Sequence, residues 1–116
     1  MEKGELWLTN LPQQVGKEQV GRRPALIIAN TQTGLLIVLP LSANLETSIY
    51  PHTLKINASD RNGLDKESVA LLFQLRAIDK KRMMHKIGDL EENYLNETDS
   101  KLKKLLQLKC RSKLTQ

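Results

Sequence analysis

Two aliphatic runs follow each other near the middle of the chain, at Ala25 to Ala29 and Leu35 to Leu39, with a short turn through Asn30 and Gly34 between them. Short runs that are apolar on both faces are typical of fully buried strands, and Asn and Gly favour a tight hairpin turn. The pattern predicts a hairpin of two buried strands. Because 116 residues suffice for one such core, we expect a single domain over residues 1–116.

Other apolar segments on either side of this hairpin also have the length of strands. They lie at Glu5 to Leu8, Thr53 to Ile56, Val69 to Phe73, Leu75 to Ile78 and His85 to Leu90. We expect polar loops at Thr9 to Arg22 and Ser42 to Pro51, and we expect Trp7 and Phe73 in the core. About six strands with such connections predict a mainly β fold, a small β-barrel.

The hydrophobic period changes from about Glu92 onward. Four leucines fall near one helical face, with lysines opposite: Leu95, Leu102, Leu105 and Leu106. This pattern predicts a C-terminal amphipathic helix, for which Asn96 or Thr98 is the candidate N-cap. The sequence beyond about Cys110 is expected to fray.

The net charge of +5 does not by itself locate a ligand on the folded body. Six Lys and Arg residues and no acid lie in the last sixteen positions, and without them the net charge is −1.

No run approaches the roughly 20 apolar residues of a membrane span, and the start lacks a signal-peptide pattern. Cys110, the single cysteine, cannot form an intramolecular disulfide. We expect a cytoplasmic protein with no metal or cofactor.

The segment from Gly16 to Pro24 places an acid, an amide and two arginines between glycines, at the entrance to a predicted strand. Arginine presents a planar set of donors that matches phosphate oxygens, and glycines let the backbone approach a ligand closely. The segment is therefore a candidate phosphate site. A solvated loop with a surface ion pair would have the same spacing.

Further motifs accompany this loop in a definite order along the chain. They are Gly4-Glu5-Leu6-Trp7, Val15 to Gln19 with Gly21, Arg23 and Pro24, the strand that ends at Asn30, Pro40-Leu41-Ser42, Pro51 to Leu54, Gly63-Leu64 with Ser68, and Gln74 to Arg82. In these motifs the chain resembles the MazF/PemK family of toxin ribonucleases over nearly its whole length. The resemblance implies an SH3-like barrel that forms a homodimer and cleaves single-stranded RNA at short sequences. It also implies an antitoxin partner, which we expect to be acidic and partly disordered.

The resemblance also assigns the catalytic positions. The family's catalytic arginine, its neighbouring glutamate and its hydroxyl, usually threonine, fall on Arg23, Glu18 and Ser42. In metal-independent cleavage the ribose 2′-OH attacks the adjacent phosphorus and leaves a 2′,3′-cyclic phosphate and a 5′-OH. Arg23 would stabilise the phosphorane, and Ser42 would donate to a non-bridging oxygen. Glu18 would either orient Arg23 or accept the 2′ proton.

Several polar side chains are candidates for RNA binding. They are Lys17, Gln19, Arg22, Tyr50, Gln74, Arg76, Lys80 and Arg82. Tyr50 is the candidate for stacking on a base. The Gln74 and Arg76 pair would equally well satisfy loop carbonyls, and the cluster from Lys80 to Arg82 would equally well be a solvated edge.

Other functions fit parts of the sequence. His52 and His85 would form an acid and base pair in a different scheme, and Cys110 is a weaker candidate nucleophile. A non-catalytic binding module on the same fold is the main alternative, either a gyrase poison or a homologue that binds RNA or antitoxin without turnover.

Overall fold

The computed structural model describes residues 1–12 and 21–109. Its elements are β1 (Glu5–Leu11), β2 (Gly21–Asn30), β3 (Leu35–Ser42), the 3-10 helix η1 (Leu45–Ile49), β4 (Thr53–Ile56), β5 (Ser68–Leu71), η2 (Leu72–Gln74), β6 (Arg76–Asp79), η3 (Lys80–Arg82), β7 (Met83–Asp89) and α1 (Glu92–Leu105). The predicted mainly β fold with a C-terminal helix is confirmed, with seven strands where about six were expected. Among the described helices, none is long and apolar enough to cross a membrane.

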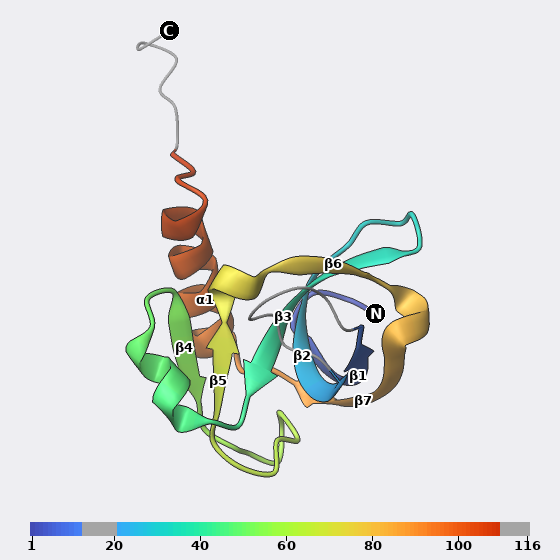
Figure 1. Ribbon diagram of the computed structural model, residues 1–116, viewed down its shortest axis with the longest axis horizontal. Helices are drawn as coiled ribbons and strands as arrows, with labels where there is room; N and C mark the ends of the chain where they lie inside the picture. Colours follow the sequence, from blue (N-terminus) through green and yellow to red (C-terminus); the bar gives the residue numbers. More distant parts are fainter. Residues whose placement is uncertain (13–20, 110–116) are drawn as a thin grey trace, which may run out of the picture.

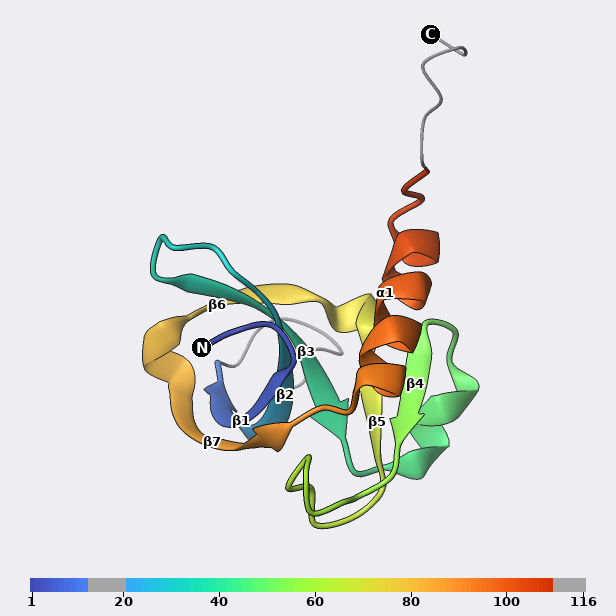
Figure 2. The ribbon, with the colours of Figure 1, turned by 180° about the vertical axis from the view of Figure 1, so that it is seen from behind.

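The strands pair antiparallel in the order β4-β5-β3-β2-β1-β7, and β6 pairs with the first half of β3. The ribbon of β6 and β7 curves around β1, β2 and β3, which gives this part a barrel-like shape (Figure 1). Strands β4 and β5 stand beside it, and α1 lies against them when the molecule is seen from behind (Figure 2).

Two hydrophobic clusters form the core, and the same strands contribute to both because side chains alternate between the two faces of a strand. The first cluster includes Leu6, Leu26, Leu39, Leu41, Leu54, Ile56, Ala70 and Leu102. The second includes Leu11, Ala25, Ile27, Leu36, Val38, Ile78 and Met83, with Trp7 packed against it. The predicted hairpin is thus buried on both faces.

The strands extend further than the apolar runs indicate. Arg22 and Arg23, which were expected in a loop, lie in β2, and Ser42 is the last residue of β3 rather than the first of a loop. The ladder between β1 and β2 continues through both arginines to Gly21. Backbone pairing thus carries polar residues into the strands, where a hydrophobic pattern gives no signal.

Three predictions about the periphery are wrong. The N-cap of α1 is Glu91, and Asn96 and Thr98 lie within the helix, where the Thr98 hydroxyl donates to the Tyr94 carbonyl at 2.8 Å. Phe73 is 42% exposed rather than buried, because β5 ends at Leu71 and the turn of η2 directs only Leu72 into the core. Leu106 also lies outside the apolar face, as the half-exposed C-cap of α1.

Candidate active site

The backbone of Arg23 is held by the neighbouring strand. Arg23 pairs with Thr9 in the ladder between β1 and β2, and the Thr9 hydroxyl donates to the Arg23 carbonyl at 2.8 Å. Thr9 is fully buried. Sequence analysis missed Thr9 because it was assigned to a loop, although a threonine next to an apolar segment is a common strand residue.

Arg23 and Ser42 lie at the same end of the hairpin of β2 and β3, just beyond the last pair of its ladder. Ala25 pairs with Pro40 across β2 and β3, and two residues further along each strand are Arg23 and Ser42. Because residues two apart share a face, both belong to the face that carries the second core cluster. The two predicted catalytic residues that the structure describes therefore share one face at one end of the hairpin.

Arg76 belongs to the same face. It is the first residue of β6 and pairs with Val38 of β3. Val38 and Ser42 are an even number of residues apart, so they point to the same face of β3. Gln74 ends η2 just before it, and both side chains are partly buried. Arg23 and Arg76 thus lie on the two sides of β3 and on the same face as Ser42, with Arg76 paired four residues along β3 from Ser42. Arginines are suited to binding a phosphate.

Ser42 is almost completely buried at the end of β3. Its Oγ accepts a hydrogen bond of 3.1 Å from the backbone N–H of Asn44. A hydroxyl that accepts one bond still has its proton to donate. The Asn44 N–H therefore holds the Ser42 oxygen at the end of β3, and the hydroxyl keeps a proton that it can donate.

A hollow of about 260 Å³ lies at the start of β2. Among the residues that the structure describes, its lining includes Leu8, Arg22, Arg23, Pro24, Leu41, Ala43, Leu64, Asp65, Lys66 and Ser68. Three cations and one acid among these residues give it a positive balance. Ser42 does not line it, although Leu41 and Ala43 on either side do. Sequence analysis did not identify Lys66, because nothing in its local spacing links it to Arg22.

Tyr50 is exposed, as a residue that stacks on a base must be. Its ring meets that of Phe73 edge-to-face, with 5.9 Å between the centroids and 74° between the planes. Tyr50 is 52% exposed, and the two rings with Pro51 border a shallow apolar hollow of about 140 Å³.

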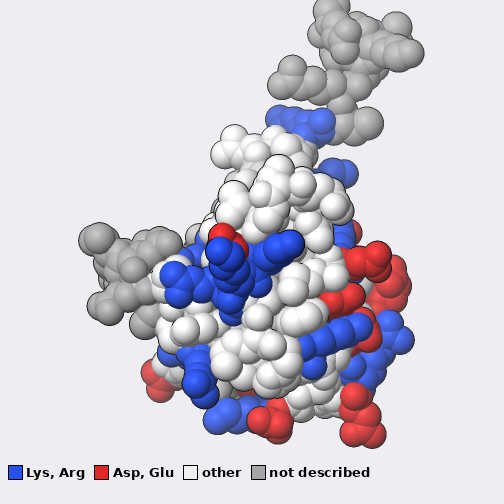
Figure 3. Space-filling view, turned by 90° about the vertical axis from the view of Figure 1, so that its right-hand side faces the viewer, with Lys and Arg blue, Asp and Glu red and all other residues white. Residues whose placement is uncertain are grey.

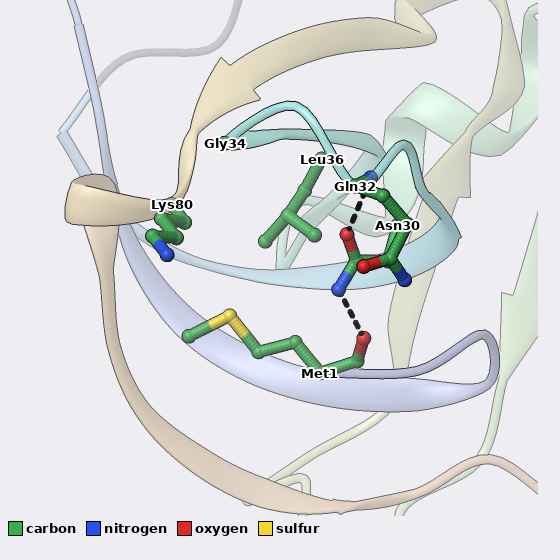
Figure 4. A pocket seen from close by; sticks show the side chains of 6 residues that line it. All are labelled: Met1, Asn30, Gln32, Gly34, Leu36 and Lys80. Carbon is green, nitrogen blue, oxygen red and sulfur yellow. Dashed lines mark hydrogen bonds between the residues drawn. The ribbon is translucent and has the colours of Figure 1, made fainter.

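The basic residues of η3 lie far from Ser42. The Lys80 N–H donates to the Gly34 carbonyl at 3.0 Å, so η3 sits at the opposite end of β3, about 20 to 25 Å away along the strand. Figure 3 views the side that η3 occupies and shows Lys and Arg side chains gathered there beside an acidic one. Lys80 also faces a separate hollow of about 150 Å³ with Met1 and Asn30 (Figure 4).

The remaining candidates are not assembled with Arg23 by the described structure. His52 lies in the turn before β4, His85 lies in β7, and both are exposed. Because β4 and β7 are at opposite ends of the strand order, the fold does not pair the two histidines. Neither lines the hollow at Arg23. Four candidates lie outside the described residues: Lys17, Glu18, Gln19 and Cys110.

Comparisons with known proteins agree with this fold. The family model described as PemK-like, MazF-like toxin of type II toxin-antitoxin system matches residues 2–106. Endoribonuclease EndoA of Bacillus subtilis (strain 168) is 33% identical over 112 residues, which cover 93% of this chain and 96% of EndoA.

Two solved structures from Deinococcus radiodurans are also similar. A crystal structure of MazF superposes with a TM-score of 0.79 at 29% identity, covering 93% of this chain and 97% of that one. A MazE-MazF crystal structure superposes with a TM-score of 0.70 at 27% identity, covering 94% of this chain and 97% of that one. The chain therefore belongs to the PemK-like and MazF-like toxins of type II toxin-antitoxin systems.

Proposed function

We propose that this toxin is an endoribonuclease that cleaves single-stranded RNA at short sequences without a metal ion. The observation that carries the proposal is that Arg23 and Ser42 lie on one face of the sheet, each two residues beyond the pair of Ala25 and Pro40. The 33% identity to an endoribonuclease supports the same activity. Cleavage of mRNA by such an enzyme would stop translation and growth.

In the proposed reaction the substrate supplies the nucleophile. The ribose 2′ oxygen loses its proton, to Glu18 or to water, and forms a bond to phosphorus. The bond to the 5′ oxygen breaks and that oxygen takes up a proton from water, so the products are a 2′,3′-cyclic phosphate and a 5′-OH. The Arg23 guanidinium neutralises the charge that grows on the phosphorane oxygens, and the Ser42 hydroxyl donates to one of them. Glu18, from the segment before β2, accepts the 2′ proton or orients Arg23.

RNA contacts beyond the scissile phosphate follow from the same placement. Gln74 and Arg76 lie on the Ser42 side of the sheet and would contact the nucleotide at the cleavage site. We assign the other contacts to Lys17, Gln19, Arg22, Tyr50, Lys80 and Arg82. Because η3 lies about 20 Å or more from Ser42, Lys80 and Arg82 would contact RNA several nucleotides away.

We further propose that the toxin works in the cytoplasm as a homodimer, as one domain over residues 1–116, and that an acidic, partly disordered antitoxin covers Arg23. A MazE-MazF structure at 27% identity supports such a partner. An acidic segment that folds on binding would complement the cationic hollow at Arg22 and Arg23.

The test is cleavage of a long single-stranded RNA in EDTA by wild type, Arg23→Ala and Arg61→Ala. Arg61 is exposed and does not line the hollow, so it controls for loss of one positive charge. We expect sequence-specific cuts with 5′-OH ends, reduced at least about 100-fold in Arg23→Ala only. No cleavage of any RNA would contradict the proposal and direct the next assay to DNA gyrase inhibition.

A further inference from the structure

We propose that Arg22 and Lys66 form a second phosphate site, which binds the RNA backbone next to the scissile phosphate. This site rests on the proposed ribonuclease function and extends it. Arg22 is adjacent to Arg23 in β2, so the two residues point to opposite faces of the strand. The second site therefore lies on the face of the sheet opposite the catalytic face, at the start of β2.

The hollow has an apolar floor and a charged rim. Leu8 and Pro24, which pair across β1 and β2, lie in its lining with the buried Leu41. Arg22 and Lys66 are exposed at its rim. Its volume of about 260 Å³ far exceeds the roughly 30 Å³ share of one water molecule, so it has room for part of a nucleotide.

The loop that carries Lys66 is fixed before any ligand binds. The Ser68 hydroxyl donates to the Lys66 carbonyl at 3.1 Å, and the Leu64 N–H donates to Oδ1 of the fully buried Asn62 at 3.0 Å. The Asn62 amide in turn donates to the Glu91 carboxylate at 3.1 Å. These bonds tie the loop to the start of α1, and the loop places Lys66 in the lining of the same hollow as Arg22.

Charge and continuity favour RNA as the occupant. Arg22, Arg23 and Lys66 outweigh Asp65, and a lysine ammonium suits phosphate as a point charge. Arg23 lines this hollow and also belongs to the catalytic face. A strand whose reacting phosphate contacts Arg23 would therefore continue directly into the hollow. The apolar floor would cover the ribose or base of that nucleotide.

The experiment compares wild type with Lys66→Ala, Lys66→Arg and Lys103→Ala. Lys103 is exposed on α1 and lines a different hollow, so its removal changes the net charge equally. The probe is a labelled RNA with a 2′-deoxy nucleotide at the mapped cleavage site. We expect Lys66→Ala to raise the Kd about 5- to 10-fold and to reduce the slope of log affinity against log salt by about 0.7. Lys66→Arg should restore most of the affinity.

A methylphosphonate scan of the same RNA locates the contact. Removing the charge at one phosphate beside the scissile one should weaken binding by wild type but not by Lys66→Ala. The inference is overturned if Lys66→Ala matches Lys103→Ala while wild type cleaves RNA. It is equally overturned if Lys66→Ala weakens only the binding of an acidic peptide. A wild type that neither binds nor cleaves RNA would overturn both proposals.

Discussion

The buried hydroxyl of Thr9 in β1 donates a hydrogen bond of 2.8 Å to the backbone carbonyl of Arg23 in β2. The two residues are also partners in the ladder between these strands. The position of the arginine is thus set by a side chain on another strand, close to where β2 begins. A group that must meet a phosphate in the transition state depends on such support, because small displacements reduce the rate strongly.

Replacing Thr9 with valine should therefore lower kcat without abolishing binding. The substitution keeps the shape and removes one hydrogen bond, which is worth about 1 kcal/mol, so we expect a loss of about 5-fold in kcat and a small rise in KM. Thr31→Val is the matched control, because the Thr31 hydroxyl also donates to a carbonyl, that of Leu35, but in an exposed turn. Equal kcat values for the two variants would contradict a positioning role for Thr9.

Two substitutions of Ser42 test its hydroxyl. Ser42→Ala should reduce kcat about 100-fold if the hydroxyl donates to the phosphorane. Ser42→Thr keeps the oxygen and restricts its rotamers, so its single-turnover rate should equal or exceed that of wild type. The Tm of each variant should lie within a few degrees of the Tm of wild type. A Ser42→Ala enzyme with full activity would exclude the hydroxyl from the reaction.

Much of this site follows from the sequence, and the rest depends on long-range contacts. The apolar runs predict the hairpin of β2 and β3, and the resemblance to MazF/PemK toxins selects Arg23 and Ser42. Their common face follows only from the register, which pairs Ala25 with Pro40. Local hydrophobicity cannot fix a register, since a slip of one residue would exchange the two faces.

Lys66 illustrates what local patterns omit. Its neighbourhood looks like an ordinary polar turn, and it joins Arg22 only because Asn62 and Glu91, 29 residues apart, hold the loop against α1.

Phe73 is the opposite case. An aromatic residue after an apolar run suggests a core position, yet the end of β5 at Leu71 places it outside. The place where a strand ends is set by its pairing partners.

The Glu91 carboxylate should make stability depend on pH. Burial by itself would raise the pKa of Glu91, but hydrogen bonds from Ser59, its own backbone N–H and Asn62, together with Arg61, hold this pKa below its usual 4.5. The resulting stabilisation is fully present above the unfolded pKa and is lost as pH falls through the lower folded pKa.

Chemical denaturation at pH values from about 6 down to 3 measures this dependence. Wild type should lose stability as the pH falls below about 4.5, and Glu91→Gln should lose less over the same range. Glu97→Gln, an exposed substitution on α1, should follow wild type. A Glu91→Gln curve parallel to that of wild type would show that this carboxylate does not cause the acid loss.

Two glycines with similar backbone angles should respond differently to alanine. Gly63 has φ +71°, and an added Cβ would lie 1.9 Å from the Ile87 carbonyl oxygen. Gly34 has φ +91°, with nothing within 4 Å of the same position. We expect Gly34→Ala to cost about 1–2 kcal/mol of unfolding free energy from backbone strain alone. Gly63→Ala should cost at least about 2 kcal/mol more. Equal Tm values would mean that the contact with β7 relaxes freely.

The exposed pair of Tyr50 and Phe73 should contribute to RNA binding if it stacks on a base. Tyr50→Ala would then raise the Kd for the uncleavable RNA about 5- to 150-fold, since a stacked base contributes about 1–3 kcal/mol. Tyr50→Phe should bind like wild type, because stacking needs the ring and not the hydroxyl. Ile49→Ala provides the control, as Ile49 is an 82% exposed apolar neighbour without a ring. If Tyr50→Ala and Ile49→Ala bind RNA equally well, the ring pair does not stack on a base. The base must then be recognised by polar side chains nearer to Arg76.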